Sequence, residues 1–480
     1  MKKIYVGTLL LFLVSIGYSQ NDKKDYSEAF KLIEVWLESQ KDFEQLPGIM
    51  AVIVEDQEVL WSGAYGMANQ EENVEAQPST ICSICSISKL FTAVAIMKLY
   101  DEGKLRLDDR IEELLPWYDL GQKFPDSGPI TIRSLLTHSS GLPREADSPY
   151  WTGPDFPFPN QQEVREGLKH QETLYPSFTY FQYSNLGLTL LGEVVEEISG
   201  MPFDDYITEN ILEPLNLEDT RTEMPENLYG NELAVGYSAM TRQGTRERIN
   251  FFQARGIKAA AGFSSTVEDL AKFASWQFRL LDTTGTEILK PSTLKYMQNV
   301  HWTDPDWKTG WGLGFSVYQS GGSKWVGHGG SCPGYRSTLQ MNPQSKRAYS
   351  VIINAGGTNP GKYVRGMHEI LEKVKGTTDA EIDGEGIADI DLADYEGYYD
   401  LQPWASEAYF SVWEGKLMQI SLPSSSPANS MTFYEHIESD TFRRIRDDGE
   451  LGETLIFDRN KQGEVTRYKS HGNYSEKLIR

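Results

Sequence analysis

Apolar residues recur at helical spacing in several segments of the first 375 residues. Positions three or four apart share one face of a helix, so this spacing predicts helices that each bury one face. One of them starts at Ser86 and carries Leu90, Val94 and Met97. The helices predicted in this way are 26–43, 86–103, 186–198, a helix that opens with a capping box at 265–268, and 363–374.

Shorter apolar runs between turn signals predict strands in the same part of the chain. Residues 49–54 and 58–65 flank the turn at Asp56-Gln57, so we expect them to pair as the start of an antiparallel sheet. The other predicted strands are 312–318, 324–326, 337–341 and 348–354. This part of the chain therefore combines helices with an antiparallel sheet.

The composition changes after Lys375. Residues 376–386 are polar, acidic and contain glycine, which is typical of a linker. Strand-like runs follow at even spacing between turn signals, and this pattern predicts a small β-barrel. The runs are 395–399, 408–413, 416–422, 430–437, 441–446, 453–458 and 464–470. We therefore divide the mature chain into residues 20–375, the linker and a barrel over 387–480.

Residues 1–19 have the features of a secretory signal peptide. Lys2 and Lys3 precede an apolar run over 4–16, and we expect cleavage after Ser19. The run is shorter than the roughly 20 residues that span a membrane. No cysteine lies near the cleavage site to carry a lipid anchor. We expect a periplasmic or secreted protein without a membrane anchor.

Charge and size narrow the choice of partners. The formal charge is -24 at pH 7, and the loss of Lys2 and Lys3 makes it -26. Acidic residues are dispersed along the chain, so nucleic acid and anionic membrane surfaces are poor partners. A length of 480 residues with 39% hydrophobic positions allows one large core and a smaller one. We expect no cofactor and no metal, because the scattered histidines lack metal-ligand spacing.

Ser86 and Lys89 form a Ser-x-x-Lys motif at the start of a predicted helix. Their spacing places both side chains on one face, where an unprotonated lysine can take the proton of a serine that attacks a carbonyl. Partly positive amides at the helix start stabilise an oxyanion and disfavour a protonated lysine. Ser292 and Lys295 repeat the spacing, so the motif alone does not identify the nucleophile.

A second motif, Tyr183-Ser184-Asn185, lies just before the helix predicted at 186–198. A phenol near a lysine ammonium is easier to ionise, so Tyr183 can hold a phenolate or relay a proton between Lys89 and a leaving group. Asn185 offers a donor and an acceptor, which suits holding Lys89 while touching a substrate amide. Tyr229-Gly230-Asn231 also matches Tyr-x-Asn, but no predicted helix follows it, and we interpret it as a turn.

A third motif has two candidates. His328-Gly329-Gly330 ends a strand-like run before Ser331, and its glycines let the strand approach an acyl group closely. Lys308-Thr309-Gly310 lies in a polar stretch that is expected to be a loop. We prefer the His328 segment because of its strand-like approach.

In this order, and with the connecting segment 130–142, the motifs resemble those of the serine β-lactamase and penicillin-binding-protein superfamily. The resemblance covers roughly 47–354 and is to the branch with class C β-lactamases, D-aminopeptidases and esterases. It implies an α/β (α+β) fold, with an antiparallel sheet flanked by helices and a helical insert that holds Tyr183. The barrel resembles the lipocalin-like domain often appended to such hydrolases. We expect it to be packed, and to shape the active-site rim or mediate assembly into an oligomer.

The resemblance also implies roles for individual residues. Ser86 would carry the acyl group, with Lys89 and Tyr183 as general base and acid. The backbone amides of Ser86 and Ser331 would form the oxyanion hole, and three further residues would contact the substrate. These are Asn185, His328 and Gly330.

His328 departs from the lysine that β-lactam-hydrolysing relatives usually have at that position. Because a histidine can be neutral at pH 7, recognition of a substrate carboxylate should be weakened. We therefore expect an exported serine hydrolase that cleaves an ester or amide bond of a small molecule or peptide. The alternatives are a β-lactamase or D-alanyl-D-alanine carboxypeptidase, and a sensor or binding protein without turnover.

Four other residues have structural interpretations. His138 is expected to be a structural histidine that bonds its own loop. The three cysteines, Cys82, Cys85 and Cys332, are expected to be small buried residues. A disulfide remains an alternative, because the superfamily geometry would bring Cys85 and Cys332 near one active site and an exported protein can oxidise such a pair.

Overall fold

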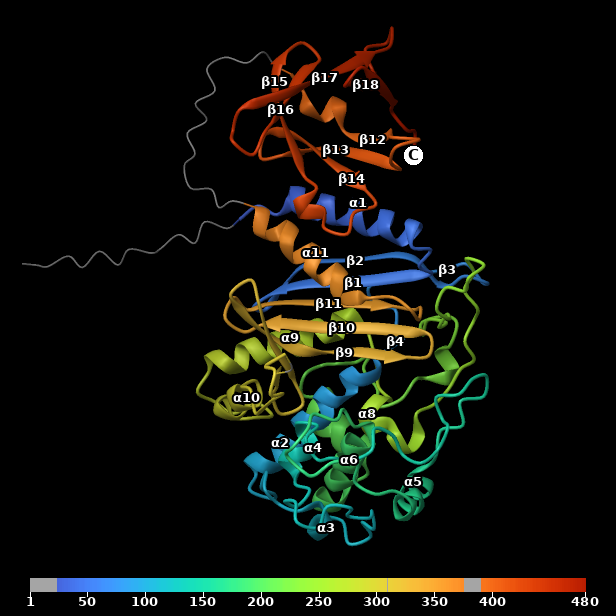
Figure 1. Ribbon diagram of the computed structural model, residues 1–480, viewed down its shortest axis with the longest axis vertical. Helices are drawn as coiled ribbons and strands as arrows, with labels where there is room; N and C mark the ends of the chain where they lie inside the picture. Colours follow the sequence, from blue (N-terminus) through green and yellow to red (C-terminus); the bar gives the residue numbers. More distant parts are fainter. Residues whose placement is uncertain (1–23, 309, 375–389) are drawn as a thin grey trace, which may run out of the picture.

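The computed structural model describes residues 24–308, 310–374 and 390–480 (Figure 1). The predicted signal peptide and the linker over 376–386 lie outside these ranges. No helix within them is long and apolar enough to cross a membrane.

A nine-stranded sheet forms the centre of the larger part of the molecule, with strand order β3-β2-β1-β11-β10-β9-β8-β7-β6. Every neighbouring pair in it is antiparallel. The strands are β1 (Gly48–Glu55), β2 (Glu58–Asn69), β3 (Val74–Glu75), β6 (Trp302–Thr303), β7 (Gly310–Trp311), β8 (Ser316–Ser320), β9 (Ser323–Cys332), β10 (Tyr335–Asn342) and β11 (Arg347–Ile353). The sheet therefore joins the two ends of the 48–353 segment, since β1 pairs with β11.

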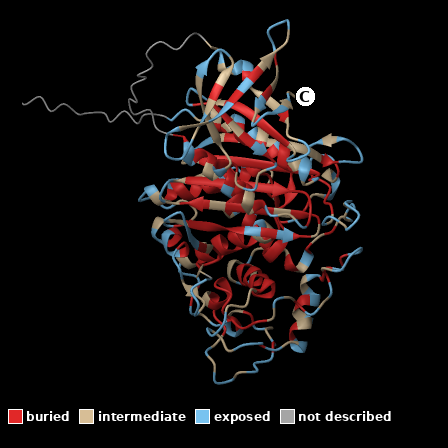
Figure 2. Cartoon of the chain, turned by 45° about the horizontal axis from the view of Figure 1, so that its top comes forward, coloured by how far each residue is buried: buried red, intermediate tan, exposed pale blue. Residues whose placement is uncertain are grey.

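Two hydrophobic cores lie on opposite faces of this sheet, because successive side chains of a strand point to opposite faces. Met50 and Val52 of β1 belong to one core, and Ile49 and Ile53 belong to the other. Buried positions are concentrated in the sheet and in the helices packed against it (Figure 2). The expected arrangement, helices on both faces of an antiparallel sheet, is confirmed.

Helices α1 and α11 cover one face, and α9 packs on the other (Figure 1). Beyond α9 lies a helical region built around α2 and α6. The helices are α1 (Ser27–Phe43), α2 (Ser88–Asp101), α3 (Ile111–Leu114), α4 (Ile132–Leu136), α5 (Gln161–Gly167), α6 (Asn185–Ser199), α7 (Phe203–Ile207), α8 (Lys258–Ala261), α9 (Val267–Asp282), α10 (Pro291–Met297) and α11 (Pro360–Lys373). Two short strands, β4 (Cys82–Ser83) and β5 (Ser264–Ser265), form a separate two-stranded antiparallel sheet.

The start of α9 shows how local chemistry sets a boundary. A capping box was expected at 265–268, but the cap is Thr266, whose side chain accepts a hydrogen bond from the Asp269 amide at 3.0 Å. Ser265 instead lies in β5. The helix cap therefore lies one residue later than the capping box predicted from the sequence.

The C-terminal residues form an eight-stranded sheet that nearly closes into a barrel. Its strands are β12 (Gly397–Asp400), β13 (Glu407–Trp413), β14 (Lys416–Leu422), β15 (Thr432–Glu438), β16 (Thr441–Ile445), β17 (Leu451–Arg459), β18 (Val465–Ser470) and β19 (Asn473–Glu476). The bridge between Tyr399 and Lys477 brings the first and last strands together. Strand β19 was not predicted, because its short polar sequence lacks apolar alternation.

Aromatic side chains fill the interior of the barrel. Tyr399, Phe410 and Phe457 are buried there with other apolar residues, so the expectation of a packed barrel is confirmed. The barrel packs on α1, where the Trp36 indole donates a hydrogen bond to the Ser424 carbonyl at 2.9 Å. Helices α1 and α11 lie between it and the large sheet, on the face away from α2 and α6 (Figure 1). The barrel therefore does not shape a rim around Ser86, and assembly remains a prediction for it.

Candidate active site

Ser86 lies in a single 3₁₀ turn, Cys85–Ile87, and the α-helix α2 begins only at Ser88. The prediction that the α-helix begins at Ser86 is wrong. Cys85 has a φ of 51°, a conformation from which an α-helix cannot continue. The turn still places residues three apart on one side, so Lys89 Nζ lies 3.2 Å from Ser86 Oγ.

The Lys89 amine is buried and held by three oxygen atoms. Besides Ser86 Oγ, it donates to Asn185 Oδ1 at 2.8 Å and to the Ala260 carbonyl in α8 at 2.7 Å. Burial lowers the pKa of Lys89 well below its ordinary value, Arg144 lowers it further, and the Glu145 charge opposes both effects. Two N–H groups stay on the carbonyl oxygens when the third proton leaves. The lone pair that remains then faces the Ser86 hydroxyl, which is the geometry of a general base.

Asn185 bonds to protein partners at both ends of its amide. Its Oδ1 accepts from Lys89, and its Nδ2 donates to both carboxylate oxygens of Glu145, at 2.8 and 3.0 Å. One lone pair of Oδ1 remains for a second donor, and contact of Asn185 with a substrate amide stays a prediction. Its amide orients the lysine amine, because the Glu145 carboxylate fixes which end of the amide faces Lys89.

Glu145 is a site residue that the sequence analysis missed. Besides Asn185 it accepts hydrogen bonds from the Tyr150 hydroxyl and, at 3.1 Å, from Arg144 Nε. It lies on a loop 40 residues before Asn185, so no local spacing connects the two. The only available signal was its position just after the connecting segment 130–142.

Tyr183 packs its ring beside the lysine. Lys89 Nζ lies 4.9 Å from the ring centroid, and the Arg144 guanidinium carbon lies 5.0 Å from it on an exposed side chain. Burial raises the pKa of Tyr183, and its contact with the Ser86 side chain only partly offsets this rise. The predicted phenolate is therefore disfavoured, because burial penalises the charged forms of both Tyr183 and Lys89. A neutral phenol beside a neutral amine can pass a proton in either direction.

His138 holds the loop that carries Tyr183. Its Nδ1 accepts a hydrogen bond from the Ser184 amide at 3.1 Å, and its ring lies 4.3 Å from the Tyr183 ring between centroids. Burial lowers the pKa of His138 well below its ordinary value, so the ring stays neutral. The ring therefore has a structural hydrogen bond, but to the Tyr183 loop 46 residues away rather than to its own loop as expected.

His328 of β9 presents a neutral ring to the same site. Its Nδ1 is 2.6 Å from the Gly329 carbonyl oxygen, which can only accept, so Nδ1 carries the proton. Its Nε2 is then an acceptor, buried and without a hydrogen-bond partner within the described part of the chain. Burial, with the Lys89 charge, lowers the pKa of His328 to about 3. The rings of Tyr183 and Trp311 lie 6.2 and 5.6 Å away between centroids.

Gly330 allows β9 to approach the turn that carries Ser86. A Cβ at Gly330 would lie 2.2 Å from the Ile84 carbonyl oxygen and 2.0 Å from Ser337 Oγ, so any side chain would push the strand away. Gly329 has open space around it by comparison. Ser331 follows on β9 with an exposed side chain. The requirement for glycine at residue 330 therefore comes from backbone packing rather than from contact with a ligand.

The rival motifs lie elsewhere. The Lys308 side chain is 82% exposed and pairs with Asp306 at 2.8 Å, and Thr309 lies outside the described residues. Ser292 and Lys295 are exposed on α10. The ring of His328, in contrast, lies 6.2 Å from that of Tyr183 between centroids.

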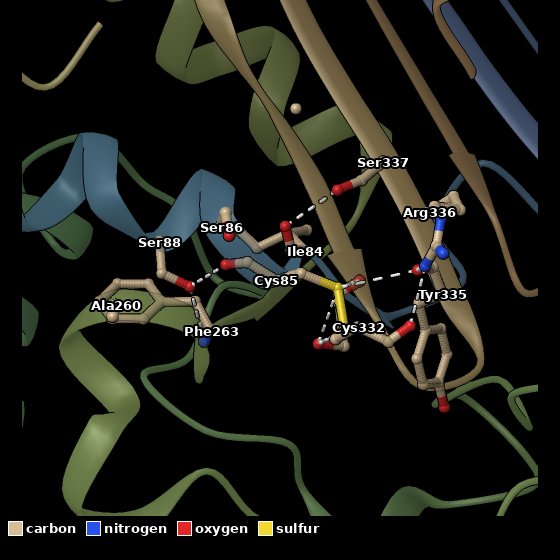
Figure 3. Close-up of a disulfide and its surroundings, with 12 residues drawn as sticks. Ile84, Cys85, Ser86, Ser88, Ala260, Phe263, Cys332, Tyr335, Arg336 and Ser337 are labelled. Atoms are coloured by element: carbon tan, nitrogen blue, oxygen red, sulfur yellow. Dashed lines mark hydrogen bonds between the residues drawn. A yellow bond between two sulfur atoms is a disulfide. The ribbon is translucent and has the colours of Figure 1, made fainter. Parts of the chain in front are cut away.

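Cys85 and Cys332 form a disulfide, with Cα atoms 5.7 Å apart (Figure 3). Cys82 is free and buried. The expectation of three small unbridged residues is therefore wrong for two of them. Spacing along the chain carried no such signal, because 247 residues separate the bridged pair. No group of three or more His, Cys, Asp or Glu side chains that could hold a metal ion occurs in the ranges described.

Comparison with known proteins gives consistent matches. The Beta-lactamase family model matches residues 36–372. Beta-lactamase-like protein 2 of Dictyostelium discoideum is 27% identical over 369 residues, which are 74% of this chain and 64% of that protein. The chain thus spans just under two thirds of that relative's length.

Two solved structures share the fold. The octameric penicillin-binding protein homologue from Pyrococcus abyssi has a TM-score of 0.63 and 25% identity, covering 93% of this chain and 100% of that one. A D-stereospecific amidohydrolase from a Streptomyces species has a TM-score of 0.57 and 23% identity, covering 71% of this chain and 97% of that one. The first match extends over the C-terminal sheet as well, because it covers nearly all of this chain.

The neutral state of His328 should make stability depend on pH. In the folded chain its pKa is about 3, whereas an unfolded histidine has a pKa of about 6.5. The unfolded state therefore binds a proton more readily between these values. The resulting stabilisation is complete above pH 6.5 and is lost by up to about 1.4 kcal/mol for each pH unit below it.

Chemical denaturation of the wild type and of His328→Gln at pH 7, 5.5 and 4 measures this effect. The variant lacks the titrating group. As the pH falls, the wild type should therefore lose unfolding free energy relative to the variant. A difference that stays constant across the three pH values would mean that the pKa of His328 is the same in the folded and the unfolded chain, and would contradict the lowered value.

Proposed function

The chain belongs to the Beta-lactamase family, and we propose that it is a serine hydrolase that cleaves an ester or amide bond through an acyl-enzyme on Ser86. The observation that carries the proposal is the position of the Lys89 amine. It lies 3.2 Å from Ser86 Oγ, and its other two N–H groups are held by Asn185 Oδ1 and the Ala260 carbonyl. Packing alone would not require a buried amine with a lowered pKa, whereas a general base does.

Acylation begins when neutral Lys89 takes the proton of Ser86 as Oγ attacks the substrate carbonyl carbon. The carbonyl π electrons move onto oxygen, and the backbone amides of Ser86 and Ser331 stabilise that oxyanion, each donor contributing about 3 to 4 kcal/mol. The oxyanion then collapses and the bond to the leaving group breaks. Tyr183 gives its proton to the leaving group and regains one from Lys89, which is neutral again.

Deacylation repeats these steps with water as the nucleophile. The same pair removes a proton from water as it attacks the acyl carbon, and returns a proton to Ser86 Oγ as that oxygen leaves. Each residue ends in the state in which it began. Burial of Lys89 and Tyr183 supports this cycle, because it keeps both in neutral forms that exchange a proton without creating a lasting charge.

The substrate is proposed to be an uncharged ester or amide at the His328 end of the site. A neutral imidazole with a free Nε2 accepts a hydrogen bond from an N–H or O–H group but does not attract a carboxylate. Arg144, the cation beside Tyr183, is already paired with Glu145. The D-stereospecific amidohydrolase with the same fold is compatible with an amide substrate. This argues for an esterase or amidase over a β-lactamase or D-alanyl-D-alanine carboxypeptidase.

We also propose that the protein acts outside the cytoplasm. The Cys85–Cys332 disulfide supports this, because such bonds persist mainly in oxidising compartments. The lysine-flanked apolar run at the start of the chain is the second argument.

Substitution of the nucleophile tests the proposal. Ser86→Ala should abolish both turnover and covalent labelling by a fluorophosphonate, because it removes the hydroxyl that is hydrogen-bonded to Lys89 Nζ. Ser292→Ala is the matched control and should retain both. Lys89→Ala should lose roughly 10²- to 10⁴-fold in kcat, the usual contribution of a general base. Peptide mapping that finds the label on Ser292 would contradict the assignment, and labelling of Ser86 without turnover would favour a sensor.

A substrate panel tests the proposed class. Short-chain p-nitrophenyl esters should be hydrolysed, and a chromogenic cephalosporin should be hydrolysed weakly or not at all, because His328 offers no charge to its carboxylate. D- and L-aminoacyl anilides would separate amidase from esterase activity. A cephalosporin kcat/KM of about 10⁷ to 10⁸ M⁻¹s⁻¹, near the diffusional range, would overturn the preference.

Two alanine substitutions form the control for this panel. His328→Ala should depress kcat/KM for the preferred ester, since it removes the unpartnered acceptor. Lys308→Ala should change stability by no more than about 0.5 kcal/mol and leave activity intact, because it removes an exposed charge. The reverse result would make Lys308-Thr309-Gly310 the third motif and restore carboxylate recognition.

A further inference from the structure

The disulfide lies between the two residues that are proposed to bind the oxyanion. Cys85 directly precedes Ser86, and Cys332 directly follows Ser331. These segments come from a turn and a strand that are 247 residues apart in the chain. Figure 3 shows the bridge between the turn and β9, with Ser86 beside it.

We propose that the Cys85–Cys332 disulfide is a positioning device that holds the backbone amides of Ser86 and Ser331 in register for one oxyanion. This inference rests on the proposed serine hydrolase function and adds to it two positioning residues. An oxyanion hole needs two donors within about 3 Å of one oxygen atom. A covalent bridge next to both donors limits how far they can separate.

The turn and this part of the strand pack against each other, and the disulfide is the covalent link between them. No hydrogen bond joins residues 85–87 to residues 328–332 among the residues that the structure describes. The Ser337 hydroxyl donates to the Ile84 carbonyl at 2.9 Å, but this contact leads to β10. Gly330 packs against Ile84, and this van der Waals contact opposes separation far more weakly than a covalent bond does. The Ile84–Ser337 hydrogen bond reaches Ser331 only through the pairing of β10 with β9, whereas the disulfide joins the residues directly next to Ser86 and Ser331.

The backbone of Cys85 also needs such a constraint. Its φ of 51° is in the left-handed region, which is unfavourable for a residue with a side chain. A strained residue keeps its conformation only when surrounding contacts hold it there. The conformation of Cys85 sets the direction of the next amide, which is that of Ser86, so a bond from its sulfur to β9 fixes this donor as well.

The bridge is shielded from solvent and built into its surroundings. Cys85 is 0% and Cys332 5% exposed, and the Ser83 hydroxyl lies 3.3 Å from Cys332 Sγ. The free thiol of Cys82 is buried nearby in the sequence, on β4, but takes no part in the bridge. Cys82 therefore provides a matched control for loss of a buried sulfur.

The first measurement is a thiol count on the full-length protein, by alkylation under denaturing, non-reducing conditions and mass spectrometry. One alkylated residue, Cys82, is expected. Three alkylated cysteines would overturn the proposal outright.

The second measurement compares the double variant Cys85→Ala/Cys332→Ala with Cys82→Ala, using the preferred aryl ester. Misplacement of an oxyanion donor should lower kcat of the double variant by about 10- to 100-fold with little change in KM. Cys82→Ala should match the wild type. Values are expressed per active site titrated with a fluorophosphonate, so a smaller folded fraction does not count as a slower enzyme.

A transition-state analogue separates positioning from general loosening of the fold. A boronic acid forms a tetrahedral adduct with Ser86 that needs both amides, whereas the carboxylate product needs neither. The affinity of the double variant for the boronic acid should fall in parallel with kcat, while its affinity for the product stays the same. Boronate affinity and kcat within about twofold of the wild type would reduce the disulfide to a structural role.

A second variant covers the case in which the first does not fold. Cys85→Gly/Cys332→Ala keeps the left-handed backbone without strain, and it should show the same parallel loss in kcat and boronate affinity. Full activity of this glycine variant would overturn the proposal. Labelling of Ser86 in the wild type tests the hydrolase function separately, so failure of the positioning role alone leaves that function standing.

Discussion

The chemistry of the site depends on the burial of one amine. Lys89 is almost without solvent contact, and a buried ammonium is costly unless it is paired with a charge. Its direct partners are a hydroxyl, a side-chain amide and a backbone carbonyl, so neutralisation is the less costly state. The Glu145 carboxylate bonds to the Asn185 amide rather than to the Lys89 amine. It orients the amide that holds the lysine without forming an ion pair that would keep the lysine charged.

The fold brings four separate segments to this amine. The turn before α2 supplies Ser86, the start of α6 supplies Asn185, α8 supplies a carbonyl, and β9 supplies His328. His138 fixes the Tyr183 loop to the start of α6 through the Ser184 amide. The large sheet then acts as the rigid support for β9, and the barrel lies behind α1 and α11 on its other face. Because the barrel lies on the opposite face of the sheet, none of its described residues belongs to the candidate site.

Local patterns in the sequence predicted what is local in the structure. Three-residue spacing placed Ser86 beside Lys89, and helical periodicity located α1, α6 and α11 to within a few residues. Glu145 was not predicted, because its contact with Asn185 joins two loops. The disulfide was only an alternative. The resemblance placed Cys85 and Cys332 near one another, but the sequence does not show whether the pair is oxidised. The neutral state of the Tyr183 phenol was not predicted either. Burial is a property of the assembled fold, and its effect on the pKa of Tyr183 outweighs that of the neighbouring amine.

The most direct test of the central claim, that Lys89 is a neutral base, is the pH dependence of kcat/KM of the wild type for an aryl ester. An ordinary lysine has a pKa of about 10.4. If Lys89 is neutralised by burial, the rise of kcat/KM with pH should end well below that value. A rate that still climbs tenfold per pH unit up to about pH 10 would show that Lys89 is charged in the free enzyme, and would contradict the account.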